Sequence, residues 1–375
     1  MSKKKHLTKR QKMRKRRKRI LITELVVLLL LSGFLFAWLK LGLINFEKMG
    51  EIATNDLDAE TEEMLQGYTT IALFGVDNRS NGEYESGNSD SIMIAAINND
   101  TKEVKIVSVY RDTALDIDGD RTIRKANYAY NHGGAEEAIE MLNRNLDLDI
   151  QDYVAVDFNA LVEAVDAVGG VELTLTSEEI EIMNDKGYIN EVASVTGHED
   201  EAPSSLKAGT QTVNGVVATA YCRIRYTSGG DFARAERQRT VVSQLVEKAQ
   251  SASLTELNDL IEAIFPNIST SLSLTQLIGL ASGMKDYTLA DTTGFPFALC
   301  TGTLSSKTGS LDIPCTLESN VKSLYAYLYG EENYEPSAVV QDISDYIEKQ
   351  SGYTEEDAVD YGYGTEQTSD GTSEE

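Results

Sequence analysis

Residues 69–113 read TTIALFGVDNRSNGEYESGNSDSIMIAAINNDTKEVKIVSVYRDT, a segment in which β-rich runs alternate with turn-forming residues. It contains three runs, at 69–76, 91–97 and 104–109, that are rich in the β-branched and aliphatic residues typical of strands. Asn98-Asn99-Asp100 separates the second run from the third and is a strong turn signal. We therefore predict three strands, with the last two joined as a hairpin.

Strands and helices alternate downstream of this stretch. Patterning predicts a helix over 135–146, a strand over 153–158, a helix over 160–168 that ends at Gly169-Gly170, and a strand over 171–175. Such alternation indicates an α/β fold, in which helices pack on a sheet. Further helices are predicted over 212–223, 232–249, 254–263 and 274–286.

The N-terminal end has the charge pattern of a membrane anchor. Residues 1–19 carry many lysines and arginines and no acidic residue, whereas residues 20–44 are largely apolar, with Glu24 and Lys40 as their charged members. Crossing a bilayer takes about 20 helical residues, and the positive-inside rule keeps the basic end in the cytoplasm. We predict a single-pass helix in the cell membrane with an extracellular catalytic domain. A cleaved signal peptide is the alternative, but residues 35–39 lack the small-residue cleavage site it needs.

The remainder of the chain is acidic. The 375 residues have a formal net charge of -26 and are 41% hydrophobic, which is a globular composition. An acidic body repels phosphates, so we expect no nucleic-acid partner. We divide it into an acidic stalk at 45–67, one domain at 68–350 and an acidic tail at 351–375, which we predict to be disordered. Cys300 and Cys315 either pair or stay free, and the sequence leaves both possibilities open.

Arginines beyond the predicted membrane segment concentrate between residues 223 and 239. Arg223 and Arg225 share a face if that segment is extended. On a helix, Arg234, Arg237 and Gln238 share a face as well. Guanidinium groups match phosphate oxygens in pairs, so a bound anion with more than one charge would offset their mutual repulsion. The alternative is a solvated basic face, neutralised by local acids such as Asp231 and Glu236.

Acidic residues mark two of the predicted strand ends. Asp77 directly follows one β-rich run and Asp90 directly precedes another. If these strands are neighbours, the two carboxylates approach each other and favour a divalent cation with oxygen ligands. The alternative is turn chemistry at Asp77 and a cap at Asp90. Arg111 follows the third run and is a further candidate phosphate ligand, with Asp112 orienting it.

Taken in order, these motifs resemble the LytR-CpsA-Psr family over roughly residues 68 to 250. The resemblance implies an α/β/α sandwich with a mixed central sheet that encloses an apolar channel for a polyprenyl tail, preceded by one transmembrane helix. It also implies a phosphotransferase that moves a glycopolymer such as teichoic acid or capsule from undecaprenyl pyrophosphate to a peptidoglycan hydroxyl. The matching segments are GVDNR (75–79), SDS (89–91), YRDT (110–113), NYAYNHGG (127–134), GGV (169–171), YCRIR (221–225) and DFARAERQR (231–239).

The resemblance assigns roles to individual positions. Asp77 and Asp90 would hold Mg²⁺ or Mn²⁺, and they would act in catalysis together with Arg79 and Arg111. Either carboxylate would accept the proton of the attacking hydroxyl. Tyr110 departs from the family, which usually has proline before this Arg-Asp pair. The pyrophosphate would lie among Arg79, Arg111, Arg223, Arg225, Arg234, Arg237 and Gln238.

Two other functions remain compatible with the same residues. A polyprenyl pyrophosphate hydrolase would use the same site with water as the nucleophile. A non-catalytic wall-binding or regulatory protein would keep the fold, although it would not require the acid and arginine set. The expected partners are the polyprenyl pyrophosphate-linked glycopolymer, peptidoglycan and the membrane.

Overall fold

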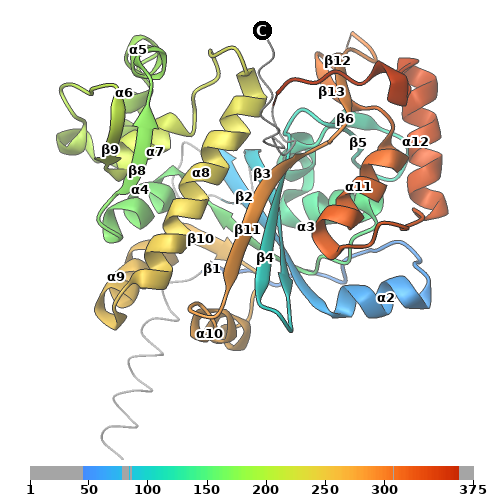
Figure 1. The fold of residues 1–375 in the computed structure, drawn as a ribbon, viewed down its shortest axis with the longest axis horizontal. Coiled ribbons are helices and arrows are strands. Elements are labelled where there is room, and N and C mark those ends of the chain that lie inside the picture. The colour runs from blue at the N-terminus through green and yellow to red at the C-terminus, as the bar shows by residue number, and fades with distance from the viewer. Residues whose placement is uncertain (1–44, 78–83, 85–86, 307, 363–375) are drawn as a thin grey trace, which may run out of the picture. The chain divides into compact units, whose positions relative to one another are not determined.

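The three β-rich runs form adjacent strands in the middle of a mixed sheet in the computed structural model of the chain (Figure 1). They are β2 (Tyr68–Asp77), β3 (Asn88–Asn98) and β4 (Glu103–Val109), and both neighbouring pairs are antiparallel. The hairpin predicted at Asn98-Asn99-Asp100 is therefore confirmed. The structure describes residues 45–77, 84, 87–306 and 308–362.

Four further strands complete this seven-stranded sheet, whose order is β1-β10-β7-β2-β3-β4-β11. Strands β7 and β11 are parallel to their neighbours β2 and β4, and β1 is parallel to β10. Strand β10 runs antiparallel to β7. The mixed central sheet is thus confirmed, and its strands at the two edges were not predicted. The added strands are β1 (Asn45–Phe46), β7 (Asp152–Val156), β10 (Ile268–Thr270) and β11 (Thr288–Phe295).

One face of the sheet packs on a layer of helices to form the larger core. Alternate side chains of β2 and β3, such as Phe74 and Ile94, are buried against these helices. The predicted helix at 135–146 is longer than expected, since α3 begins at Asn127 and bends at Gly133-Gly134, where Gly134 has a φ of 71°. The helices of this layer are α2 (Ala59–Gln66), α3 (Asn127–Leu146), α11 (Leu317–Tyr329) and α12 (Ala338–Ser351).

The other face of the sheet is covered by α4, α8 and α9, next to a smaller cluster of helices with its own core (Figure 1). The helix predicted over 212–223 is partly wrong, because residues 209–213 pair with β8. Helix α7 begins only at Gly215, where the Asn214 side chain accepts a hydrogen bond from the Val217 N–H. The elements are α4 (Phe158–Ala167), β8 (Val171–Leu175), α5 (Ser177–Asp185), α6 (Tyr188–Thr196), β9 (Gly209–Val213), α7 (Gly215–Tyr221), α8 (Gly230–Ser251), α9 (Leu254–Ile264) and α10 (Leu274–Ser282).

Short elements join these layers. Cys300 lies in β12 and Cys315 follows β13, and both are buried free thiols, so the structure contains no bond between them. The remaining strands are β5 (Ala114–Asp116), β6 (Ile123–Lys125), β12 (Leu299–Gly302) and β13 (Leu311–Pro314). The 3-10 turns are η1 (Glu199–Glu201), η2 (Phe265–Asn267) and η3 (Glu355–Asp357).

The two ends of the domain differ from the predicted stalk and tail. Residues 45–46 form the edge strand β1, so part of the predicted stalk belongs to the sheet. Within the predicted disordered tail, the Val359 N–H donates to the Leu299 carbonyl and the Tyr361 ring packs on Phe232. None of the helices in the described residues has the length and apolar character needed to cross a membrane. The predicted spanning segment at 20–44 and residues 363–375 lie outside the described residues.

Candidate active site

The predicted site residues meet because β2, β3 and β4 are neighbours. Asp77 ends β2 and pairs in register with Asn88, two positions before Asp90 on β3. Arg111 follows the end of β4, which runs antiparallel to β3, so it lies at the same end of the strands as Asp90. Asp77 and Asp90 also line one cavity. The alternation of strands along the chain thus gathers a carboxylate pair and an arginine at one end of the sheet.

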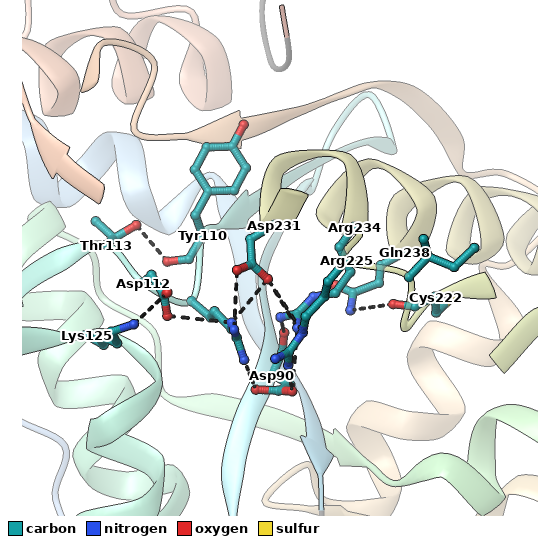
Figure 2. Close-up of polar contacts among 12 residues, drawn as sticks. Asp90, Tyr110, Asp112, Thr113, Lys125, Cys222, Arg225, Asp231, Arg234 and Gln238 are labelled. Carbon is teal, nitrogen blue, oxygen red and sulfur yellow. Dashed lines mark hydrogen bonds and ion pairs between the residues drawn. The ribbon is translucent and has the colours of Figure 1, made fainter. Parts of the chain in front are cut away.

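The Asp90 carboxylate is the centre of an ionic network (Figure 2). Its Oδ1 accepts a hydrogen bond from Arg111 at 2.9 Å, and its Oδ2 accepts one from Arg225 at 2.7 Å. Arg234 donates to the Asp90 carbonyl oxygen at 2.6 Å. Burial alone would raise the pKa of Asp90, but the positive charges of Arg234, Arg111 and Arg225 together hold this pKa below its ordinary value. Asp90 is therefore an ionised anchor for three guanidinium groups.

Asp231, at the start of α8, faces Asp90 across the same arginines. Its Oδ1 lies 3.3 Å from Arg111 Nε and 3.3 Å from Arg234 Nη1. The distance from the same oxygen to Arg225 Nε is 3.8 Å. From the sequence, Asp231 was considered only as an acid that would neutralise a solvated basic face. Three guanidinium groups held around these two carboxylates gather N–H donors of the kind that bind phosphate oxygens.

An aromatic contact lies next to this network. Tyr110 and Phe232, the neighbours of Arg111 and Asp231 in the chain, pack edge to face with ring centroids 4.8 Å apart. The tyrosine, which replaces the expected proline, is accommodated because Gly294 has no side chain. A Cβ at Gly294 would come within 2.1 Å of the Tyr110 hydroxyl oxygen. The departure from the family pattern therefore leaves Arg111 directed at Asp90.

Arg223 lies farther along the same cavity. Its guanidinium stacks over the Phe158 ring at 4.7 Å and the Tyr188 ring at 5.4 Å, and Nη1 lies 3.2 Å from Glu191 Oε2. Gln238 also lines the cavity and donates to the Cys222 carbonyl at 3.4 Å. Two aromatic rings hold the Arg223 fork in one plane, so it can bind an anion without first becoming ordered.

Arg237 is not part of this group. It is buried, and its Nε donates to Glu179 on α5 at 2.9 Å. It also donates to the Ile224 carbonyl at 3.3 Å and to the Thr227 hydroxyl at 3.1 Å. These partners satisfy its donors away from the cavity, which argues against the predicted role in pyrophosphate binding. Arg79, another predicted ligand, lies outside the described residues.

The cavity beside the network is charged at one end and apolar along the rest. Its volume is about 480 Å³, and it lies between the sheet and helices α4, α8 and α9. Asp77, Asp90, Arg225 and Arg234 form the polar end. The apolar lining includes Leu73, Met93, Val154, Leu161, Ala164, Val241, Val242, Leu245 and Ile264. A ligand that fills it must combine an anionic head with a hydrocarbon chain.

The carboxylate pair is compatible with a divalent cation. Oδ1 of Asp77 is buried and has no hydrogen-bond partner among the described residues, so it is available as a ligand. No cluster of three or more histidine, cysteine, aspartate or glutamate side chains in that part of the chain is placed to hold a metal. Two carboxylates suit Mg²⁺, which keeps several waters and takes phosphate oxygens as its other ligands.

A buried acid next to Asp112, Asp312, was not predicted from the sequence. Asp112 lies 2.7 Å from Lys125 Nζ, and its carbonyl accepts the Asp312 N–H at 2.9 Å. Burial, followed by the charges of Asp112 and Asp231, raises the pKa of Asp312 to about 7, against the opposing charges of Lys125 and Arg111. Asp312 lies in β13, and no motif in its surroundings marked it.

Comparison with known proteins shows what the chain is similar to. The chain matches the family model described as the LytR_cpsA_psr family over residues 43–294. It is 31% identical over 231 residues to "Biofilm regulatory protein A" of Streptococcus mutans, covering 58% of this chain and 54% of that protein. It is 31% identical over 214 residues to "Polyisoprenyl-teichoic acid--peptidoglycan teichoic acid transferase TagU" of Enterococcus faecalis, covering 56% and 64%. The chain thus spans between half and two thirds of the length of these relatives.

Solved structures share the fold. Protein gbs0355 from Streptococcus agalactiae superimposes with a TM-score of 0.59 at 24% identity, over 76% of this chain and 93% of that one. A LytR-CPS2A-psr family protein, YwtF (TagT), with bound octaprenyl pyrophosphate lipid, gives a TM-score of 0.50 at 17% identity, over 82% and 99%. At these identities the likeness concerns the fold alone.

Proposed function

We propose, since this chain belongs to the LytR-CpsA-Psr family, that it is a membrane-anchored phosphotransferase of cell-wall assembly. It would move a glycopolymer from an undecaprenyl pyrophosphate carrier to a hydroxyl group of peptidoglycan. The names of relatives such as TagU support this class of reaction, because that protein is called a polyisoprenyl-teichoic acid–peptidoglycan teichoic acid transferase.

The single observation that carries the proposal is the two-part cavity. Its apolar walls suit a prenyl chain, and its charged end suits a pyrophosphate. A water-soluble nucleotide or sugar phosphate would leave the apolar walls unfilled. The solved relative with bound octaprenyl pyrophosphate supports the same ligand class.

The chemistry follows from the charges at the polar end. The attacking hydroxyl oxygen bonds to the phosphorus that carries the glycopolymer, and the bond from that phosphorus to the bridging oxygen breaks. Polyprenyl phosphate leaves with the electron pair of that bond. Arg111, Arg225 and Arg234 are held in place by Asp90 and Asp231, so they stabilise the developing negative charge without first having to be ordered.

Asp77 and Asp90 are the residues that would hold Mg²⁺ or Mn²⁺. When bound, the metal would neutralise charge on the phosphate oxygens. Asp77 or Asp90 would also accept the proton of the attacking hydroxyl, since both carboxylates line the cavity.

The anchor and its orientation complete the proposal. Residues 20–44 would cross the cell membrane, with residues 1–19 in the cytoplasm and the domain outside, where lipid-linked wall polymers and peptidoglycan are located. The activated bond arrives in the donor, so a domain outside the cell needs no nucleoside triphosphate. Protease added to intact protoplasts should therefore degrade the domain, and full protection would contradict this orientation.

A direct assay tests the function. The full chain is reconstituted in lipid vesicles with an undecaprenyl pyrophosphate-linked glycopolymer and a peptidoglycan oligomer, and the products are analysed by mass spectrometry. We expect release of undecaprenyl phosphate together with a glycopolymer joined to the peptidoglycan oligomer. Release of the polymer only as a free phosphate would identify a hydrolase instead. If neither product formed, the result would favour the non-catalytic regulatory alternative.

A further inference from the structure

One segment of this acidic chain carries no charge. Residues 263–284 contain no acidic or basic side chain, although the chain as a whole has a net charge of -26. The segment comprises the end of α9, the turn η2, the strand β10 and the helix α10, whose sequence is LTQLIGLAS. A surface helix of this composition is unusual, because its exposed side would normally carry charged residues.

Apolar side chains of this segment are exposed. Ile278 on α10 is 58% exposed, and Leu277, Ala281 and Met284 around it are not buried. Phe46, on the neighbouring strand β1, is 42% exposed and pairs in register with Thr270 of β10. Exposed apolar groups that gather at one corner of a domain mark an interaction surface more often than scattered single residues do. We call this group the α10 corner, defined by Phe46, Leu277, Ile278, Ala281 and Met284.

This corner includes β1, the first strand of the described domain. The apolar run of residues 20–44 leads directly into β1, and β1 is hydrogen-bonded to β10. Adjacent strands lie about 4.8 Å apart, and α10 begins a few residues after β10. Asp152, at the start of β7, fixes this connection by accepting hydrogen bonds from Ser271 at 2.9 Å and Gln276 at 2.6 Å. The α10 corner therefore contains the strand with which the described domain begins, directly after the apolar run in the sequence.

The orientation of the cavity relates its apolar end to the α10 corner. The polar end of the cavity lies where β2 ends, at Asp77. Asp152 and α10 instead lie where β7 begins. Strands β2 and β7 are parallel, so the end of β2 and the start of β7 lie at opposite ends of the strands. Along the strands, the apolar lining extends from Asp77 back to Leu73, which pairs in register with Val154. Val154 in turn pairs with Thr270, the last residue of β10 before α10. The hydrocarbon end of the cavity is thus on the side of the α10 corner.

We propose that the α10 corner rests in the interfacial region of a phospholipid bilayer and aligns the apolar end of the cavity with the membrane. The inference rests on the proposed function in one respect, the membrane anchor at residues 20–44. The lack of charge from 263 to 284 favours lipid over a protein partner for this chain, whose remaining surface is strongly acidic. A carrier lipid could then pass from the bilayer into the cavity with its hydrocarbon tail at the α10 end. Its pyrophosphate would reach the arginines at the opposite end of the strands.

Tryptophan fluorescence tests the proposal, because the chain has a single tryptophan, Trp38, inside the apolar run. Ile278→Trp is made together with Trp38→Phe, and the full chain is placed in phosphatidylcholine nanodiscs with and without bromine on the acyl chains. We expect a blue-shifted emission that the brominated lipid quenches by about twofold or more. Val359→Trp in the same background is the matched control, because Val359 is also exposed and lies beside β12, far from α10 in Figure 1. It should be neither shifted nor quenched.

Equal, weak quenching of Ile278→Trp and Val359→Trp would overturn the proposal. A blue shift without quenching would also overturn it, since it would show that protein, such as a second copy of the chain, covers the corner. Wild-type Trp38 reports the anchor separately, because it should be quenched if residues 20–44 lie in the bilayer.

Turnover separates this inference from the proposed function. Ile278→Asp should raise the KM for a donor embedded in the bilayer several-fold and leave kcat unchanged. A water-soluble short-prenyl donor should be used equally well by the variant and the wild type. Absence of turnover in the wild type would contradict the proposed function but would leave the quenching result intact.

Discussion

Arg237 donates from its Nε to Glu179 Oε1 across 2.9 Å, and this pair ties α8 to α5 rather than facing the cavity. Both side chains are only 9% exposed. Breaking a buried ion pair by removing one partner costs about 3–5 kcal/mol, because the other charge stays buried without compensation. Arg237→Ala should therefore lower the free energy of unfolding by roughly that amount, as measured by chemical denaturation.

The double variant Arg237→Met with Glu179→Leu is the control for this prediction. It removes both charges, so it should recover much of the lost stability. The turnover of the folded fraction should stay within a few-fold of wild type in both variants. A correctly folded Arg237→Ala protein with turnover reduced a hundredfold would instead restore Arg237 as a phosphate ligand.

The contrast between Arg237 and Arg234 shows where the sequence reasoning ended. Helical spacing placed both on one face, and α8 was predicted nearly to its full length. Their partners, however, come from α5 and β3, and the local pattern of α8 says nothing about which distant element each arginine meets. A tertiary contact decided the role of each residue.

The strands of the sheet and the acidic residues show the same difference between local sequence signals and contacts made only in the folded chain. The runs that form β2, β3 and β4 were predictable because each is a continuous β-rich segment bounded by turn residues. Strand β10, with three residues, is too short for a pattern to identify. Asp312 escaped notice because its environment is created by Asp112 and Asp231, which reach it only in the folded chain.

Metal binding should depend on Asp77 with little disturbance of the arginines. Asp77 forms no ion pair with another described residue, whereas Asp90 holds Arg111, Arg225 and Arg234. Changes in the shell around metal ligands already weaken binding by about 10–100-fold, so Asp77→Asn should weaken Mn²⁺ binding at least that much. The measurement is a titration followed by the electron paramagnetic resonance signal of free Mn²⁺.

Asp90→Asn serves as the comparison. It should lose metal binding and also lower the unfolding midpoint, because three buried or half-buried guanidinium groups lose their anchor. Unchanged Mn²⁺ affinity in both variants would remove the metal from the proposed site.

Asp312 should make the protein less stable as the pH rises towards neutrality. Its pKa is raised from 3.8 to about 7 in the folded protein, so the folded state keeps a proton that the unfolded state releases. The stabilising effect of that proton is complete below the unfolded pKa and is lost as the pH rises through the folded one. One pKa unit corresponds to about 1.4 kcal/mol, so the effect reaches at most about 4 kcal/mol.

Asp312→Asn measures this effect, because the amide stays neutral at every pH. The variant should match the wild type near pH 4 and become progressively more stable than it up to about pH 7, with a constant difference above that. Chemical denaturation at several pH values gives the two curves. Parallel curves for the variant and the wild type would mean that Asp312 is ionised in the folded protein throughout this range.

The arginines of the proposed phosphate site should differ sharply from an arginine outside it. Arg223 stacks on Phe158 and Tyr188 at the cavity wall, whereas Arg144 donates to the Asp116 carbonyl at 3.3 Å and does not line the cavity. Loss of one donor to a developing oxyanion costs about 3–4 kcal/mol, so Arg223→Ala and Arg111→Ala should each reduce turnover about a hundredfold or more. Arg144→Ala should stay close to the wild type.

Lysine at position 223 refines this comparison. It keeps the charge but loses the planar fork that two aromatic rings hold in place, so it should restore only part of the turnover. Release of polyprenyl phosphate is the readout, and melting temperatures establish that each variant is folded. If Arg223→Ala and Arg144→Ala released polyprenyl phosphate at the same rate, the cluster would be a solvated basic face, because a surface ion pair contributes only about 0–1 kcal/mol.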